Sequence, residues 1–444
     1  MIWLTPHIES DGITYYAMTK SLVQHGAINI RNVPPAIRNL RRTISLVNGK
    51  PGFLYSCGYA LCYYPFMKVS ALLPVGLDSE VRLGRHPAIS TRDTIGITMG
   101  TFCYTLLALL FCYLLLARYV RPWLASVIVF SLYLGTPFFY YSQHSPAYPH
   151  AVTICLITMA LYLFDGILRD RGTYIHFILL GAVTGCIILV KNFNIIYTAG
   201  FFLYFLVRRD VFCKENVRRL LFFSLGLLPF IVILGAYNHQ QYGQVLTCGY
   251  LHMAHDFRHM DTQFSLNTFN LHKYFLAPSR GLIWWAPIML FAFMGLYVMK
   301  TTGSRWLYPC LAVTILLFAW LNFYTLWHGG TSFGPRLLIN LFPFLCIMLS
   351  ALAGKHRKTF LVIMTVCLVY TLLLSQAFII YDKALACKQD RRVLCVRKKV
   401  AFDVGPISLL VKVGKLRRTK QARDFYYQYL FARPPVSMLH LLLP

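Results

Sequence analysis

Ten apolar stretches of helix length restrict what this chain can fold into. They cover approximately residues 94–117, 122–141, 147–168, 174–190, 194–207, 218–237, 281–300, 306–326, 337–353 and 359–381. A helix needs about 20 mainly apolar residues to cross the hydrocarbon core of a membrane. The pattern therefore predicts an all-α integral membrane protein, with a bundle of about ten transmembrane helices over residues 94–381.

Lysine and arginine are unevenly divided among the connections between these stretches. One set of connections carries fourteen: Arg118, Arg121, Arg169, Arg171, Arg208, Arg209, Lys214, Arg218, Arg219, Lys300, Arg305, Lys355, Arg357 and Lys358. The other set carries five: Lys191, Arg258, Lys273, Arg280 and Arg336. Basic residues in short loops mark the cytoplasmic side, so the poorer set is predicted to lie outside. Loops that flank a membrane also explain much of the net charge of +28, which makes a nucleic-acid partner a poor hypothesis.

The two ends of the chain follow from the same count. Ten crossings begin and end on one side, so residues 1–93 form an extracytoplasmic first loop with interfacial helices, and residues 382–444 a basic extracytoplasmic tail. Segment 52–76 fits an interfacial or re-entrant helix at least as well as a span, and counting it as a span would invert the topology. The first twenty residues lack the apolar core of a signal peptide, so we expect a first transmembrane helix to be missing.

A short acidic segment, Ser10-Asp11-Gly12, opens the predicted first loop and is followed by Tyr15 and Tyr16. A carboxylate beside a glycine at a membrane surface can act as a general base or orient an acceptor hydroxyl. The ordinary alternative is a helix N-cap, a position that aspartate often occupies. Taken alone, the segment favours the cap.

Two further outer segments carry polar side chains. Residues 141–150 include His144 and His150, which can donate hydrogen bonds to an anion or serve as interfacial anchors, and position alone does not decide between these. Residues 327–336 begin with Trp327, His328 and two glycines and end at Arg336. The planar guanidinium of arginine suits a phosphate. Because glycines and aromatics surround it, we favour function over a snorkelling anchor or a structural ion pair.

Histidines in the long loop 238–280 raise the question of a metal. His252, His255 and His259 share a helical spacing, yet a zinc site needs three or four converging ligands, and this spacing matches no compact motif. A solvated, histidine-rich loop is the favoured interpretation. No metal ligand is assigned.

At these segments the chain resembles the GT-C class of polytopic glycosyltransferases, particularly the protein O-mannosyltransferases and the lipid A aminoarabinose transferase. The resemblance covers most of residues 10–345. It is carried by Ser10-Asp11-Gly12 with Tyr15-Tyr16, Ser21-Leu22 with Gly26, Gly135-Thr136-Pro137 through His150-Ala151, Arg280 through Pro287, and Trp327 with Ser332 through Arg336. Each motif is weak alone, and their order gives the set its specificity.

The resemblance implies transfer of a sugar from a polyprenyl-phosphate-linked donor to a glycan, lipid or protein acceptor at the outer face. Asp11 takes the place of the family's acidic residue and becomes the expected catalytic base. Arg336, with Arg280 and His150, is expected to bind the donor phosphate. The substrate is expected to contact a further set: Trp327, His328, His144, Lys191 and Tyr15. No Asp-x-Asp accompanies Asp11, which predicts metal-independent transfer, although a divalent metal stays an alternative.

Two other functions fit a multi-span chain. A transporter or lipid flippase would place ionisable residues in the middle of its spans, whereas here they sit at loop mouths. A non-catalytic membrane assembly protein is the second alternative. The sequence leaves open the sugar, the acceptor, the lipid chain length and the oligomeric state.

Overall fold

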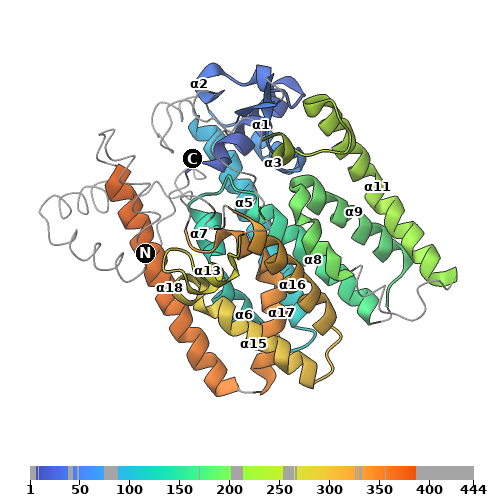
Figure 1. The fold of residues 1–444 in the computed structure, drawn as a ribbon, viewed down its shortest axis with the longest axis vertical. Helices are drawn as coiled ribbons and strands as arrows, with labels where there is room; N and C mark the ends of the chain where they lie inside the picture. Colours follow the sequence, from blue (N-terminus) through green and yellow to red (C-terminus); the bar gives the residue numbers. More distant parts are fainter. Residues whose placement is uncertain are drawn as a thin grey trace, which may run out of the picture.

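The computed structural model is a helical bundle with one short hairpin (Figure 1). It describes residues 7–8, 10–38, 44–47, 50–74, 89–169, 171–201, 214–253, 265, 268–325, 327, 329, 333–355 and 357–386. The hairpin pairs β1 (Ile44–Val47) with β2 (Lys50–Phe53) in antiparallel register. The predicted tail beyond residue 386 lies outside the described residues. The all-α prediction is confirmed.

The helices before residue 200 are α1 (Asp11–His25), η1 (Ile30–Asn32), α2 (Pro35–Arg38), α3 (Gly58–Ser70), α5 (Thr91–Leu116), α6 (Pro122–Leu134), α7 (Pro137–Gln143), α8 (His150–Leu168), α9 (Tyr174–Val190) and η2 (Asn192–Thr198). Those after it are α11 (Lys214–Tyr242), α12 (Gly249–Met253), α13 (Leu271–Leu276), α14 (Leu282–Trp285), α15 (Pro287–Thr301), α16 (Leu307–Phe323), η3 (Arg336–Leu341), α17 (Phe342–Lys355) and α18 (Arg357–Ala386).

Helix length and composition agree with a multi-pass membrane protein. Among the described residues, five helices are long and apolar enough to cross a membrane, or six if one bent pair counts as a single span. Three shorter apolar helices, α9, α15 and α16, accompany them. Lys, Arg, Asp and Glu of the described spans all lie within six residues of a helix end. Such placement keeps charge near the membrane–water interfaces, where it is least costly.

Two predicted spans differ from the observed helices. Segment 122–141 is not one straight helix, because α6 and α7 meet at 71°. Thr136 caps α7 and Pro137 occupies its first turn, so a new helix starts where the old one would continue. Segment 194–207 begins in the 3-10 helix η2, and its residues 202–207 lie outside the described part of the chain.

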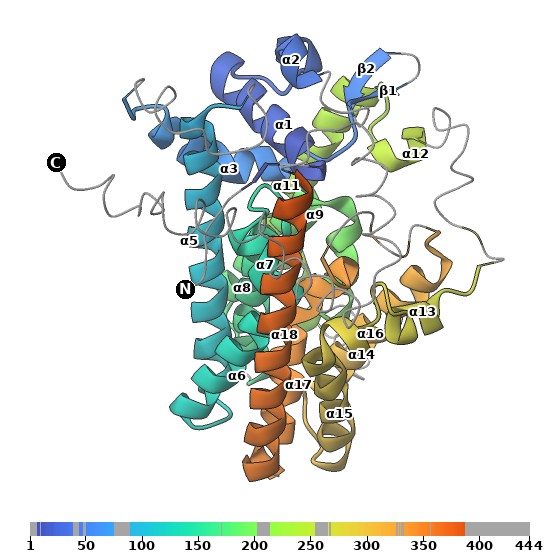
Figure 2. The ribbon, with the colours of Figure 1, turned by 90° about the vertical axis from the view of Figure 1, so that its left-hand side faces the viewer.

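The elements before α5 gather at one end of the bundle, here called the site end, together with α12 (Figure 2). The predicted interfacial segment 52–76 contains α3, whose 13 residues are too few to span a membrane. Gly58 lets α3 touch the end of α9, because an added Cβ would lie 2.4 Å from the Leu189 carbonyl carbon. The short helices of the first loop are therefore packed onto the ends of the long ones.

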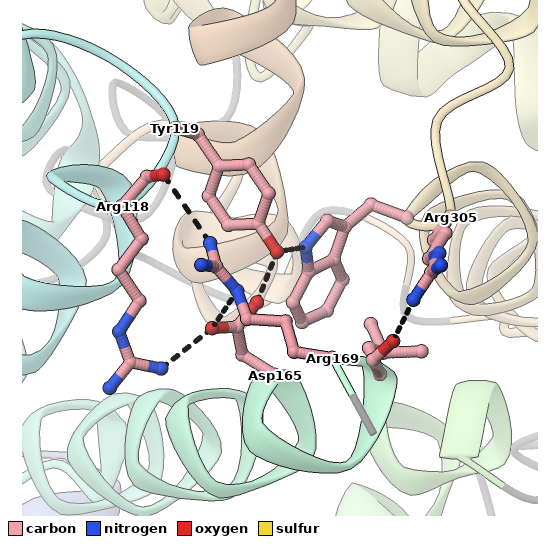
Figure 3. Close-up of polar contacts among 7 residues, drawn as sticks. Arg118, Tyr119, Asp165, Arg169 and Arg305 are labelled. Atoms are coloured by element: carbon pink, nitrogen blue, oxygen red, sulfur yellow. Dashed lines mark hydrogen bonds and ion pairs between the residues drawn. The ribbon is translucent and has the colours of Figure 1, made fainter. Parts of the chain in front are cut away.

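The opposite end of the bundle, here called the basic end, is held by a buried carboxylate (Figure 3). Asp165, near the end of α8, is fully buried and forms ion pairs with Arg118 at 2.6 Å and Arg169 at 3.0 Å. The Tyr119 hydroxyl donates to the same carboxylate and accepts from the Trp306 indole at 2.9 Å. The ends of α5 and α8 and the start of α16 are tied together by this cluster.

Helices α9 and α11 cross with their backbones almost in contact. A Cβ added at Gly181 would lie 2.0 Å from the carbonyl oxygen of Phe223, and one added at Gly226 would lie 2.0 Å from that of Ile178. Small residues at such a crossing let two helices approach closely inside a membrane. The pair therefore behaves as one rigid unit that ends, on its α9 side, at Lys191.

Candidate active site

The carboxylate of Asp11 and the guanidinium of Arg336 meet at the site end. Arg336 Nη1 lies 3.0 Å from Asp11 Oδ2, although the two residues are 325 positions apart. Asp11 opens α1 and Arg336 opens η3. The side chains are 21% and 15% exposed, so the pair is largely shielded from water but still reachable.

Local backbone geometry aims both side chains. Asp11 is not the helix cap, because Ser10 occupies that position with a φ of 54° and makes no side-chain capping bond. A non-glycine residue in this conformation is strained, which is common at functional sites. Gly334, two residues before Arg336, has a φ of 58°, and the Phe333 amide next to it donates to the Tyr141 hydroxyl at 3.2 Å. These backbone conformations thus bring the first loop and the loop before η3 together.

Aromatic rings surround this ion pair. The Arg336 guanidinium lies 5.2 Å from the centre of the Tyr148 ring, a distance typical of a cation–π contact. Tyr15 is buried and stacks on Tyr55 with ring centres 4.4 Å apart. Burial, and then the Asp11 carboxylate, raise the pKa of Tyr15 well above its ordinary value. Its hydroxyl therefore stays protonated and can serve as a donor beside Asp11.

His150 begins α8 and faces an amide network rather than open space. Its Nδ1 lies 3.0 Å from the Asn340 side-chain oxygen, and Asn340 in turn donates to Asn194 at 3.5 Å. The Asn194 amide donates to Thr153 at 3.3 Å. These bonds join α8, η2 and η3 beneath Arg336, and the charges of Asp11 and Arg336 act on the His150 ring.

Two more cations lie close enough to feel the charge of Arg336. Lys191 follows α9, and burial, with Arg336 reinforcing it and Asp11 opposing it, lowers the pKa of its ammonium to about 8. Arg280 is only 3% exposed, and burial lowers its pKa to about 10, so it stays charged at neutral pH. Its Nη1 donates to the Ser279 carbonyl at 2.7 Å. Both predicted cations therefore lie within electrostatic range of Arg336.

The remaining predicted residues are placed less directly. His144 ends α7, is buried, and holds His7 through a 2.8 Å backbone bond and an edge-on ring contact. The contacts described for Trp327 are with α13, where the Lys273 ammonium lies 5.6 Å from its ring centre and Tyr274 packs against it. His328 lies outside the described residues. Neither described contact set reaches Asp11 or Arg336.

A small, partly open cavity adjoins the site. About 280 Å³ is unfilled when the open mouth is counted, and the enclosed part has room for about one water molecule. Its wall is formed by segments from α1, the turn after β2, the end of α9, and the region from α11 to α12: Tyr15, Leu54, Tyr55, Ser56, Lys191, Asn192, Asn238, Tyr242, Cys248, Gly249 and Tyr250. Tyr15 and Lys191 connect the cavity electrostatically to Asp11 and Arg336.

Within the described part of the chain, no three His, Cys, Asp or Glu side chains converge as a metal site requires. His252 belongs to α12, whereas His255 and His259 lie outside the described residues.

The amide network and the cavity wall were not predicted as site features. Asn340 and Asn194 both fall inside apolar stretches that were predicted to cross the membrane. A lone amide in an apolar stretch is the available signal, because buried polar groups need partners. Tyr148 and Tyr55 gave no signal of their own, since tyrosines are abundant throughout this chain.

The comparisons with known proteins bear on this arrangement through the fold. The chain matches two crystal structures of ArnT, an aminoarabinose transferase from Cupriavidus metallidurans. For the apo state, the TM-score is 0.50 over 92% of this chain and 73% of that one. For the state bound to undecaprenyl phosphate, it is 0.53 over 93% and 75%. The chain has a GT-C-type fold.

Sequence identity to both structures is 12%, so the likeness concerns the fold alone. No protein-family model matches the chain. No curated protein matches it either. The resemblance inferred from the motifs is therefore confirmed at the level of architecture, and the chemistry must be argued from the site.

Proposed function

We propose that this protein transfers a sugar from a polyprenyl-phosphate-linked donor to an acceptor at the outer face of the membrane. The observation that carries the proposal is the Asp11–Arg336 ion pair on a GT-C-type fold. Its two residues are far apart in the sequence and meet at the site end. A structural neighbour bound to undecaprenyl phosphate supports a lipid phosphate as part of the donor. A largely shielded, always-charged guanidinium is well suited to such a phosphate.

The ion pair accounts for both halves of the reaction. In the resting state Arg336 holds Asp11, and a donor phosphate competes with the carboxylate for the guanidinium. The released carboxylate accepts the proton of the acceptor hydroxyl, whose oxygen attacks the anomeric carbon of the donor. The bond between that carbon and the phosphate oxygen breaks, and the leaving phosphate takes the electron pair. Arg336 stabilises this developing charge more in the transition state than in the ground state.

A neighbouring arginine assists with phosphate binding. Arg280 adds a second fixed positive charge, and the amide network around His150 fixes the orientation of η3 from which Arg336 projects. We expect the reaction to proceed without a divalent metal, because the arginines supply the positive charge at the phosphate. A transporter is less well supported, since ionised residues in the described spans stay near helix ends.

Binding of a polyprenyl monophosphate to the purified, detergent-solubilised protein tests the proposal. Arg336→Ala is expected to weaken binding by about 10- to 100-fold, the worth of a charge-assisted hydrogen bond to phosphate. Arg219→Ala is the matched control, because Arg219 also forms an ion pair, with Glu215 at 3.1 Å, but far from the site at the start of α11. It should bind like the unaltered protein.

Two results would contradict the proposal. One is equal binding by the Arg336→Ala variant, which would remove the guanidinium from phosphate recognition. The other is no binding of any polyprenyl phosphate by the folded protein, which would favour the transporter or the assembly protein. Transfer assays with lipid-linked sugars and EDTA then test the expected metal independence.

A further inference from the structure

The cavity beside the ion pair contains polar atoms that nothing in the described chain satisfies. Asn192 Oδ1 and Ser56 Oγ are both buried, and neither has a hydrogen-bond partner among the described residues. Both residues line the cavity. Buried polar atoms without partners are costly and call for an explanation such as a missing ligand. An acceptor oxygen and a hydroxyl on one wall suit a ligand rich in hydroxyl groups.

Aromatic rings form the complementary part of the wall. Tyr55 stacks on Tyr15, and Tyr250 lies 6.1 Å from Tyr55 between ring centres. Flat apolar ring faces beside isolated polar groups are the usual composition of a small-molecule pocket. A sugar ring matches both, because its C–H faces are apolar and its edge carries hydroxyls.

The charge of the cavity wall limits which charge the bound sugar can carry. Lys191 is the only ionised residue among those that line the cavity, and the lining contains neither Asp nor Glu. No carboxylate lies within ion-pair distance of the Lys191 ammonium in the described structure, whereas the charge of Arg336 is matched by Asp11. The unmatched charge in the cavity is therefore positive. A cationic amino sugar would be repelled, and an anionic substituent would complete the pairing.

We propose that the open mouth of this cavity binds a sugar ring bearing a carboxylate, with Lys191 as the residue that selects it over an amino sugar. This inference rests on the proposed function and specifies its sugar. It also separates this chain from its structural neighbours, because an aminoarabinose unit carries the opposite charge. Asn192 and Ser56 position the ring through its hydroxyls, and the tyrosines exclude water from its faces.

Four lipids that differ only in the headgroup test the inference by binding: polyprenyl monophosphate alone, and the same lipid carrying glucuronic acid, glucose or glucosamine. The unaltered protein should prefer the glucuronic acid lipid to the glucosamine lipid by about tenfold or more. Lys191→Met should abolish that preference and leave binding of the bare phosphate within about twofold. Lys191→Glu should reverse the preference, and Lys191→Arg should retain it. Binding of the bare lipid also shows that each variant is folded.

Each alternative outcome has a distinct meaning. If Lys191→Met weakens the bare lipid as much as the glucuronic acid lipid, Lys191 is a phosphate ligand and the inference is wrong. A preference of the unaltered protein for the glucosamine lipid also overturns it. Failure to bind even the bare lipid would instead defeat the proposed function.

The anionic sugar can belong to the donor or to the acceptor, and one added arm separates them. Methyl glucuronide is titrated into protein already saturated with bare polyprenyl phosphate. Binding that depends on Lys191, without any advantage of the glucuronic acid lipid over the bare lipid, supports the inference and assigns the cavity to the acceptor. A preference for the glucuronic acid lipid assigns it to the donor.

Discussion

The two ends of the bundle use the same chemical pair in opposite ways. At the basic end, Asp165 is fully buried, and two arginines and a tyrosine hydroxyl saturate its carboxylate. At the site end, Asp11 and Arg336 remain partly exposed and share one described bond of 3.0 Å. A carboxylate with every position filled can only hold helices together. A carboxylate that is partly exposed and lies beside a cavity is available for chemistry.

Helix α8 makes this contrast visible within one element. It begins at His150, next to the site, and carries Asp165 fifteen residues later, roughly 22 Å away at the usual helical rise. The carboxylates near the two ends of this helix differ in exposure, because Asp165 is fully buried whereas Asp11 is 21% exposed. The partly exposed carboxylate identifies the end that is available for chemistry.

The largest expected effect comes from removing the proposed base. Asp11→Asn keeps the size of the side chain but removes its ability to accept a proton, so turnover should fall by about 10²- to 10⁴-fold. Donor binding should persist, because Arg336 loses a competitor rather than a partner. Transfer of a lipid-linked sugar and binding of the bare lipid phosphate are measured on the same preparation. Full activity in this variant would remove Asp11 from the mechanism.

The corresponding change at the basic end should act on stability. Asp165→Asn leaves Arg118 and Arg169 without their buried counter-charge, at a cost of about 3 kcal/mol, the lower end for breaking such pairs. Both arginines are about one-third exposed, and water offsets part of the loss. Thermal inactivation in detergent should show a lower midpoint, while activity per folded molecule stays unchanged. A selective loss of activity would mean that the two ends are functionally coupled.

A change of pH should affect the site end next. The Lys191 pKa of about 8 means that its charge is mostly present at pH 7 and mostly lost at pH 9. Binding of a glucuronic acid lipid should therefore weaken by up to about tenfold across this range, whereas Lys191→Met should show a flat profile. Binding of the same lipid at a series of pH values is the measurement. Strengthening with rising pH would contradict the assigned sign.

The smallest effect is expected at an exposed pair. Glu215 and Arg219 form an i,i+4 pair in the first turns of α11, and their side chains are 48% and 30% exposed. Surface pairs of this kind contribute about 0.5 kcal/mol or less. Glu215→Gln should leave both the inactivation midpoint and donor binding nearly unchanged. A loss comparable with that of Asp165→Asn would show that exposure does not separate the two kinds of pair.

The sequence was informative where physics is local or where motifs keep a fixed order. Composition alone was enough to predict the helix-length apolar stretches and to place Arg118 and Arg169 among the basic loops. Asp11 and Arg336 were singled out by their charge on a sparsely charged side and by their motifs. Their direct contact joins two residues that are 325 positions apart in the sequence. That contact depends on how distant helices pack, which periodicity does not encode.

Other features could not be predicted for the same reason. The 71° bend between α6 and α7 lies in a stretch that is apolar throughout, and only Gly135-Thr136-Pro137 indicates it. The cavity requires the end of α9 to meet the turn after β2, two segments with no shared pattern. The loss of hydrogen-bond partners at Asn192 and Ser56 appears only once both are in place.

The close crossing of α9 and α11 sets the frame of the cavity. Its backbones touch at Gly181 and Gly226, so a side chain added at either position would push the two helices apart. Both helices reach the cavity at their ends, through Lys191 and Asn238. The turn that carries Tyr55 and Ser56 leads into α3 and is held to α11, because Tyr237 donates to the Tyr55 carbonyl at 2.8 Å. A larger side chain at Gly226 should therefore change the shape of the cavity from a distance.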